Sequence, residues 1–462
     1  MRAHNHWNRL AFAGFLFCLV WAPLPFASHR PWAAALLCIL FCVVFLFWLM
    51  AESIRPSHSA LANIKRVKVP LCCLLLIQII VVLQQVPIPA AIMKIASPQA
   101  AIFYDTTAWR PLSLDVYSTQ LYLMKGLCFS LAFLCTVFLV DSKRRFKLAC
   151  YCIVGSGLLQ ATYGSMMVLS GLEYGFFVEK YVGRGAATGT FVNSNHFAGY
   201  MIICMSVAIG IIIAHGEKRG RDGNRFSWLH SFEYLLSGNG LLRIAVAVMI
   251  VALMLSHSRS ANLFFVLALS AGVLVSMLHA RKLDTKLIVL FIGFIVIDII
   301  VVGQWFGLRE VAERLAATQL EAEDRGSIAM MAFAIVRDFP LTGIGGGAFD
   351  VVFPAYKDAA FDLRYEHVHN DFIEIAAEVG LLGFLAFAGF FLSAMVLIYR
   401  RILARSSRIY RGVAYAGVIL GVWLSLHSLT DFNMQIAANA MTVVVICGLI
   451  WNAASLPAGE NQ

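Results

Sequence analysis

The sequence has few charged residues for its length. Only 13% of its 462 residues are Asp, Glu, Lys or Arg, while 60% are hydrophobic. Soluble domains carry roughly 25% charged residues. A chain with so little charge cannot cover itself with water-compatible surface, so a set of soluble domains is excluded and one bundle of membrane helices is favoured.

Several local signals are missing as well. The eleven cysteines lie within or at the ends of apolar runs, as at Cys38, Cys72 and Cys204, and none has metal-ligand spacing. This excludes a disulfide framework and argues against a metal site. No small-residue cleavage site follows the first apolar run, so a retained helix is expected there. The glycine run at 343–347 lacks the Lys-Ser/Thr ending of a phosphate-binding Walker loop.

Long apolar runs are what the sequence has instead. A helix needs about 20 mostly apolar residues to cross roughly 30 Å of hydrocarbon. The predicted fold is therefore all-α, a polytopic bundle of about twelve transmembrane helices with a large helical loop outside the membrane. The expected spans are 10–28, 32–51, 69–87, 120–140, 146–170, 193–214, 241–256, 260–279, 286–303, 371–399, 411–429 and 436–453.

Lys and Arg gather in alternate loops of this arrangement. The clusters lie at 55–68, 143–147, 218–225, 281–286 and 400–411. With twelve spans, these loops and both termini fall on one side, which the positive-inside rule places in the cytoplasm. The formal charge of +10 is therefore a mark of membrane orientation, and we do not expect the chain to bind nucleic acid.

The spans and loops divide the chain into four expected parts. Residues 1–170 hold the N-terminal spans, 171–303 the central spans and 371–462 the C-terminal spans. Between them, residues 304–370 form a segment that is too long for a plain connector. This segment contains an apolar helix at 328–336, a proline and the glycine run, so we expect a small folded cap on the outer face.

The end of the cap carries the clearest candidate residues. His367 and His369 form a histidine pair, followed by Asn370 and, on one helical face, by Asp371, Glu374 and Glu378. Ionisable residues at membrane depth usually face a bundle interior or a wet cavity. For Asp371 a solvated interfacial position is an equal alternative, and a lone interfacial histidine is more often a structural hydrogen-bonding residue. No further ligand stands nearby at zinc spacing, so no metal is expected.

Arginines and small polar residues on the outer face are the other candidates. Arg259 lies between two expected spans and Arg325 precedes an apolar helix. Arginine offers a fixed fork of donors suited to phosphate, whereas snorkelling and local ion pairing are the alternatives. Arg184, Asn193 and Asn195 flank the start of the sixth span. They suit either a groove for an anionic ligand at a helix N-terminus or ordinary helix capping.

Taken in order, these places make the chain resemble the O-antigen ligase and O-antigen polymerase family. The resemblance covers roughly residues 185–400. It is carried by Gly189-Thr190-Phe191 with Asn193 and Asn195, by Ser258-Arg259, by Arg325 with its helix running to Pro340-Leu341-Thr342-Gly343-Ile344-Gly345, and by His369-Asn370 with Ile373 and Gly380. The family pattern has Leu where this chain has Ile373, which is a mild departure.

The resemblance implies a glycosyltransferase of the bacterial inner membrane that works on the periplasmic face. It implies an undecaprenyl-diphosphate-linked glycan as donor, a hydroxyl of glycan, lipid A–core or protein as acceptor, and no metal, nucleotide or other cofactor. His369 then corresponds to the catalytic base and Arg259 and Arg325 to the diphosphate ligands. Asn370, Glu374, His367, Arg184, Asn193 and Asn195 complete the expected substrate-binding set.

Other functions remain open on the sequence alone. A flippase for lipid-linked glycans also has many spans, although the inverted repeats and broken helices typical of transporters are not evident in both halves. A non-catalytic envelope assembly factor is a further possibility. Within the enzyme class, O-antigen ligase, O-antigen or exopolysaccharide polymerase and pilin-type protein O-oligosaccharyltransferase are not separated by any residue pattern.

The charge pattern generates a test of orientation. A reporter fused at residue 220 should report the cytoplasm, and one fused at residue 355 should report the periplasm, because the basic loops alternate with loops poor in Lys and Arg. Alkaline phosphatase and green fluorescent protein fusions measure the two outcomes. A cytoplasmic signal at residue 355 would place the whole candidate site in the wrong compartment.

Overall fold

The computed structural model describes residues 2–56, 58–104, 109–175, 178–180, 183–216, 238–280, 326–358 and 364–457. Within these ranges the chain is almost wholly helical, which confirms the predicted all-α class. The only strands are β1 (Tyr174–Gly175) and β2 (Val178–Glu179), which pair as a short antiparallel hairpin. The expected span 286–303 and the expected loop residues up to Arg325 lie outside the described residues.

Eight helices of the described ranges are long and apolar enough to cross a membrane, so the chain is a multi-pass membrane protein. They are α2 (Pro31–Ile54), α4 (Lys68–Gln85), α7 (Val116–Leu139), α8 (Lys143–Ser170), α9 (Ser194–Gly216), α12 (Arg259–Ala280), α16 (Asp371–Leu397) and α17 (Arg408–His427). The remaining long helices are α1 (Arg2–Trp21) and, with shorter apolar stretches, α11 (Gly238–Leu255) and α18 (Ala437–Ala453). The total of about twelve spans stays a prediction.

Helix α9 occupies the centre of the bundle. Every residue from His196 to Ala214 is buried, and α9 packs along α17, α11 and α8. A Cβ atom added to Gly210 would lie 2.2 Å from the carbonyl oxygen of Gly412, so the α9–α17 contact depends on a small residue, as is common between membrane helices. The outer helices keep exposed apolar faces, for example at Ile39 of α2, which suit contact with lipid.

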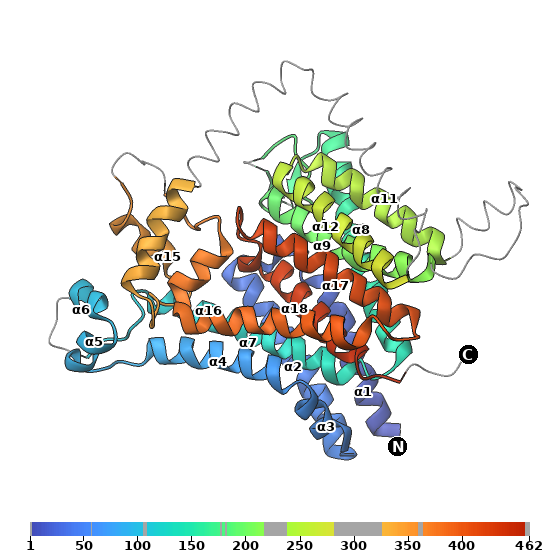
Figure 1. Ribbon diagram of the computed structural model, residues 1–462, viewed down its shortest axis with the longest axis horizontal. Coiled ribbons are helices and arrows are strands. Elements are labelled where there is room, and N and C mark those ends of the chain that lie inside the picture. Colours follow the sequence, from blue (N-terminus) through green and yellow to red (C-terminus); the bar gives the residue numbers. More distant parts are fainter. Residues whose placement is uncertain are drawn as a thin grey trace, which may run out of the picture.

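A separate apolar core lies at one end of the bundle. It joins α5 (Ala90–Ala96), α6 (Pro98–Tyr104), the helical residues 326–338, α15 (Phe349–Val352) and the 3-10 turn η2 (Phe353–Ala355) to the start of α16. Figure 1 shows α5, α6 and α15 at this end and the start of α1 toward the other. The described part of the expected cap is therefore folded, whereas its compartment stays a prediction.

The glycine run of the cap docks on a break in α16. Gly380 has a non-helical backbone conformation, with φ of 71° and ψ of 172°. The break frees two carbonyl groups of α16, and those of Ala377 and Glu378 accept hydrogen bonds from the amides of Ile344 (2.9 Å) and Gly345 (3.1 Å). The amide of Leu381 donates in return to the carbonyl oxygen of Pro340 at 2.8 Å. Two segments that the sequence shows as separate motifs thus form one joint.

This joint predicts the effect of adding a single methyl group. Gly380→Ala should unfold several degrees below the wild type, because the added Cβ would lie 2.4 Å from the Leu341 carbonyl oxygen. The backbone conformation at this position also costs an L residue about 1–3 kcal/mol. Gly155→Ala in α8 is the matched control, since no atom lies within 4 Å of its added Cβ. Thermal denaturation in detergent measures both variants, and equal midpoints would contradict the docking.

Candidate active site

The candidate base His369 lies where the cap meets α16. The next residue, Asn370, caps the helix, because its side-chain oxygen accepts hydrogen bonds from the amides of Phe372 and Ile373 at 3.1 Å each. His369 itself has a φ of 56°, a left-handed conformation that costs a non-glycine residue roughly 1–2 kcal/mol. Its side chain is 25% exposed, so the imidazole is held by its surroundings and is still open to a ligand.

A buried carboxylate, Asp431, stands behind this imidazole. Its Oδ1 atom lies 3.7 Å from Nδ1 of His369 and 3.6 Å from Nε2 of His196, at the start of α9. The same oxygen accepts a hydrogen bond from the Phe432 amide at 2.8 Å. Burial by itself raises the pKa of Asp431, but the two histidines hold that pKa well below its usual range. An anionic group is therefore shared between two imidazoles from distant parts of the chain.

The ring of Phe432 fixes three imidazoles around one point. His367 stacks on it with a centroid distance of 4.1 Å. His196 and His369 meet it edge-on at 4.5 Å and 4.9 Å. Because Phe432 follows Asp431 directly, one dipeptide supplies both the charge and the apolar surface that hold the histidine cluster together.

His367 has a partner of its own. Its Nδ1 atom lies 2.6 Å from a carboxylate oxygen of Glu374, and the other oxygen of this fully buried acid accepts from the Val368 amide at 2.8 Å. Burial lowers the pKa of His367, but the Glu374 carboxylate raises it further, so the net pKa is above the ordinary value. Glu374 therefore contacts His367 and not His369, and the group that faces His369 is Asp431.

A fourth histidine, His29, lies beside His367, with 6.3 Å between the ring centroids. It precedes α2 and follows the 3-10 turn η1 (Phe26–Ser28), in which all three residues have positive φ. Burial, with the charges of Lys125 and His367 added to it, lowers the pKa of His29 to about 3. This imidazole is thus kept neutral, and the cluster combines neutral and charged members.

Acids on the first turns of α16 tie the outer ends of the helices together. Asp371 is fully buried, which settles the choice that the sequence left open between a solvated and an interior position. It accepts hydrogen bonds from the Ser428 hydroxyl at 2.8 Å and the Met434 amide at 3.3 Å. The segment that carries Asp431 is thereby fastened to the helix that follows His369.

A polar network links this cluster to the segment of Arg259. The Ser260 hydroxyl lies 3.5 Å from Nε2 of His427, whose Nδ1 is 2.8 Å from the Asn433 amide nitrogen. Asn439 donates to both the Asn433 side chain (2.8 Å) and the His196 carbonyl oxygen (3.0 Å). Arg259 is exposed at the start of α12, so its segment belongs to the same end of the bundle.

The other predicted ligands are placed differently. Arg184 forms an ion pair with Glu179 on the exposed hairpin side of the loop, and Asn193 accepts from the Asn195 amide at 2.8 Å as it precedes α9. These contacts are those of local pairing and capping. Arg325 lies outside the described residues. Among the residues that the structure does describe, no group of three or more His, Cys, Asp or Glu is arranged to hold a metal ion.

Sequence reasoning did not select Asp431, His196 or His29. One signal was present for Asp431, which is the sole acid in the short segment 428–436 between two apolar spans, where an ionisable residue is costly and calls for a reason. The distances along the chain hide the rest. His196 and Asp431 are 235 positions apart, and no periodicity connects them.

Comparison with known proteins bears on the same region. A family model described as O-Antigen ligase matches residues 244–388, which include Arg259, His367, His369, Asn370 and Glu374 and end before Asp431. The comparison with curated proteins gave no match. The matched domain, with its histidine at the cap and its broken helix α16, places the chain in the O-antigen ligase and polymerase family of glycan-transferring membrane enzymes.

Proposed function

We propose that this chain transfers glycan from undecaprenyl diphosphate to a hydroxyl acceptor at the periplasmic face of the bacterial inner membrane. The observation that carries the proposal is the partly exposed His369 in front of the buried Asp431. The family membership supports the class of reaction. The transfer machinery then occupies the parts 171–303, 304–370 and 371–462, with the spans of 1–170 packed around it.

The two residues have complementary tasks. The Nδ1 atom of His369 faces Asp431, so this nitrogen carries the proton and Nε2 is left to accept one from the acceptor. At 3.7 Å the contact is longer than a hydrogen bond, and catalytic contacts of this kind often tighten only when substrate binds. The carboxylate then stabilises the imidazolium that forms, in the manner of a base oriented by a buried acid.

The reaction proceeds as a single displacement. The acceptor oxygen attacks the anomeric carbon, and its proton moves to His369. The bond from that carbon to the diphosphate oxygen breaks, and the electron pair leaves with the lipid diphosphate, so the configuration at the sugar is inverted. Arg259 and Arg325 neutralise the charge that develops on this leaving group, and neither a metal nor a nucleotide enters the proposed step.

The acceptor is a hydroxyl of a glycan, of lipid A–core or of a protein. His369 can serve each of these, because a base acts on the hydroxyl and not on the rest of the acceptor. Glu374 and His367 hold the loop that presents His369, and Asn370 fixes the start of the helix behind it. These contacts support a positioning role for the three residues.

The first test separates the base from its neighbours. His369→Ala should lower turnover by roughly a hundred- to ten-thousandfold, the usual worth of a general base, while donor binding survives. Asp431→Asn should lower kcat by about ten- to a hundredfold with little change in KM, since it removes a charged contact made by the base. His367→Ala should be milder. Asp350→Asn, which breaks an exposed ion pair with Arg364, is the control for the aspartate change.

Turnover and donor binding are measured separately in membranes with confirmed expression. Full turnover in His369→Ala would remove the base assignment. A loss of donor binding in the same variant would make the residue a diphosphate ligand, and an Asp431→Asn enzyme with unchanged kcat would show that the carboxylate has only a structural role.

The second test concerns the two arginines. Arg259→Ala and Arg325→Ala should each slow transfer by about ten- to a hundredfold, because a charged hydrogen bond contributes about 1.5–3 kcal/mol. Lys at either position should restore only part of the rate, since it keeps the charge without the fork of donors. Wild-type rates in both folded and inserted Ala variants would refute the assignment.

A further inference from the structure

Two adjoining cavities lie in the transmembrane bundle beneath the candidate active site. The inner one, of about 90 Å³, is enclosed by α4, α7, α16, α18 and the 3-10 turn η4 (Asn433–Gln435). The outer one, a groove of about 530 Å³, runs between α16 and α17. Phe387, Phe391 and Met434 line both, so the two spaces share a wall and can hold parts of one ligand.

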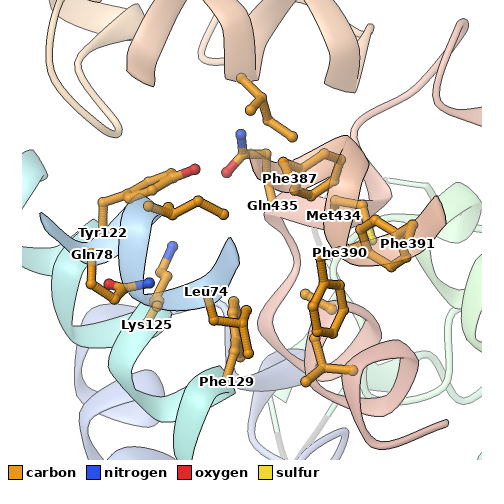
Figure 2. Close-up of a pocket in the computed structure, with 15 residues that line it drawn as sticks. Leu74, Gln78, Tyr122, Lys125, Phe129, Phe387, Phe390, Phe391, Met434 and Gln435 are labelled. Carbon is orange, nitrogen blue, oxygen red and sulfur yellow. The ribbon is translucent and has the colours of Figure 1, made fainter. Parts of the chain in front are cut away.

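The inner cavity has a polar and an apolar part. Figure 2 shows the phenol of Tyr122, the amine of Lys125 and the amide of Gln435 directed into the space from one side, and Phe129 and Phe390 at the opposite side. A lysine in a transmembrane helix is costly, and such residues usually mark a functional site. The cavity is therefore built for a molecule with one polar end and one apolar end.

An unsatisfied polar atom supports this interpretation. Gln78 of α4 is only 7% exposed, and its side-chain oxygen has no hydrogen-bond partner among the described residues. The amide stands beside Lys125 in the cavity wall (Figure 2) and packs against the bare backbone of Gly126, where a Cβ would lie 2.5 Å from it. A buried amide oxygen without a partner costs free energy, which a bound polar group can recover.

The cavity is also joined to the candidate active site. Lys125 interacts electrostatically with Glu378 and Glu374 of α16, and Glu374 is the acid that holds His367. At the upper end of the outer groove, Ser428 and Met434 are the two residues that bind Asp371. A ligand that fills both spaces therefore has its polar end just below the histidine cluster.

The outer groove suits a long, thin hydrocarbon. Its walls are apolar side chains of α16 and α17, with Ala388 and Gly421 as small residues at the contact. Leu392, also in the wall, is 62% exposed, so the groove opens toward the lipid phase. A chain leaving the inner cavity past Phe387 and Phe391 reaches the bilayer without crossing a polar surface.

We propose that these two spaces bind the carrier lipid, with its phosphate end at Lys125, Gln78, Tyr122 and Gln435 and its polyprenyl chain in the groove between α16 and α17. This inference rests on the proposed function for the identity of the lipid. Lys125 supplies the complementary charge, the amides supply hydrogen bonds, and the groove admits a single chain. The seat orients the leaving group below His369, while the arginines approach it from the periplasmic side.

The test uses undecaprenyl diphosphate without glycan, bound to the purified full-length protein in lipid nanodiscs and measured by native mass spectrometry. Lys125→Met should weaken binding about tenfold or more, which is the worth of one charged hydrogen bond, and should leave binding of the neutral alcohol undecaprenol unchanged. Ala388→Phe, which fills the groove, should weaken both ligands. Leu385→Phe, on the exposed side of the same helix outside the groove, is the matched control.

A second measurement does not depend on the variants. An undecaprenyl diphosphate analogue with a photoreactive diazirine at its distal isoprene should crosslink to residues 388–395 or 421–428 of the wild-type protein. Crosslinks confined to other helices, or wild-type affinity in both Lys125→Met and Ala388→Phe, would overturn the lipid site. These outcomes are independent of turnover: lipid binding here without glycan transfer would overturn the proposed function alone, and transfer that is unaffected by both variants would overturn this inference alone.

Discussion

A single buried charge organises the outer end of this protein. Removing an ionised carboxylate from water is tolerated only when partners replace the lost hydration. For Asp431 these partners are two histidines and a backbone amide, and they come from the start of α9, the cap junction and its own turn. The three segments therefore have to meet at one place, and the position of His369 follows from this requirement.

The break in α16 serves the same arrangement from below. A continuous helix would use the carbonyl groups of Ala377 and Glu378 internally, and the cap would have no place to attach. With Gly380 out of the helical conformation, those carbonyls bind the glycine run of the cap. Gln84 of α4 adds hydrogen bonds to the Thr342 and Glu378 carbonyl oxygens, both at 2.7 Å. The cap is thus fixed to the helix whose first residues carry the acids.

Charges deeper in the bundle extend this pattern toward the lipid. Glu374 is satisfied by His367, and both Glu374 and Glu378 interact with Lys125. A column of alternating charges therefore leads from the histidine cluster to an apolar cavity. In a low-dielectric interior such groups interact strongly, which favours a transfer reaction whose negative leaving group is a lipid. The geometry accounts for a polar reaction carried out at the border of a hydrocarbon layer.

The sequence by itself determined the membrane class, the helical fold, the position of most spans and the candidate His369, because apolar runs and motif order are local properties of the chain. It also singled out Glu374 and Gly380 without indicating their partners. Only the tertiary structure decided that Asp431 faces His369, that Glu374 binds His367 and that Lys125 enters a cavity. These contacts join residues far apart in sequence, and their energies arise from burial and pairing, which no local pattern encodes.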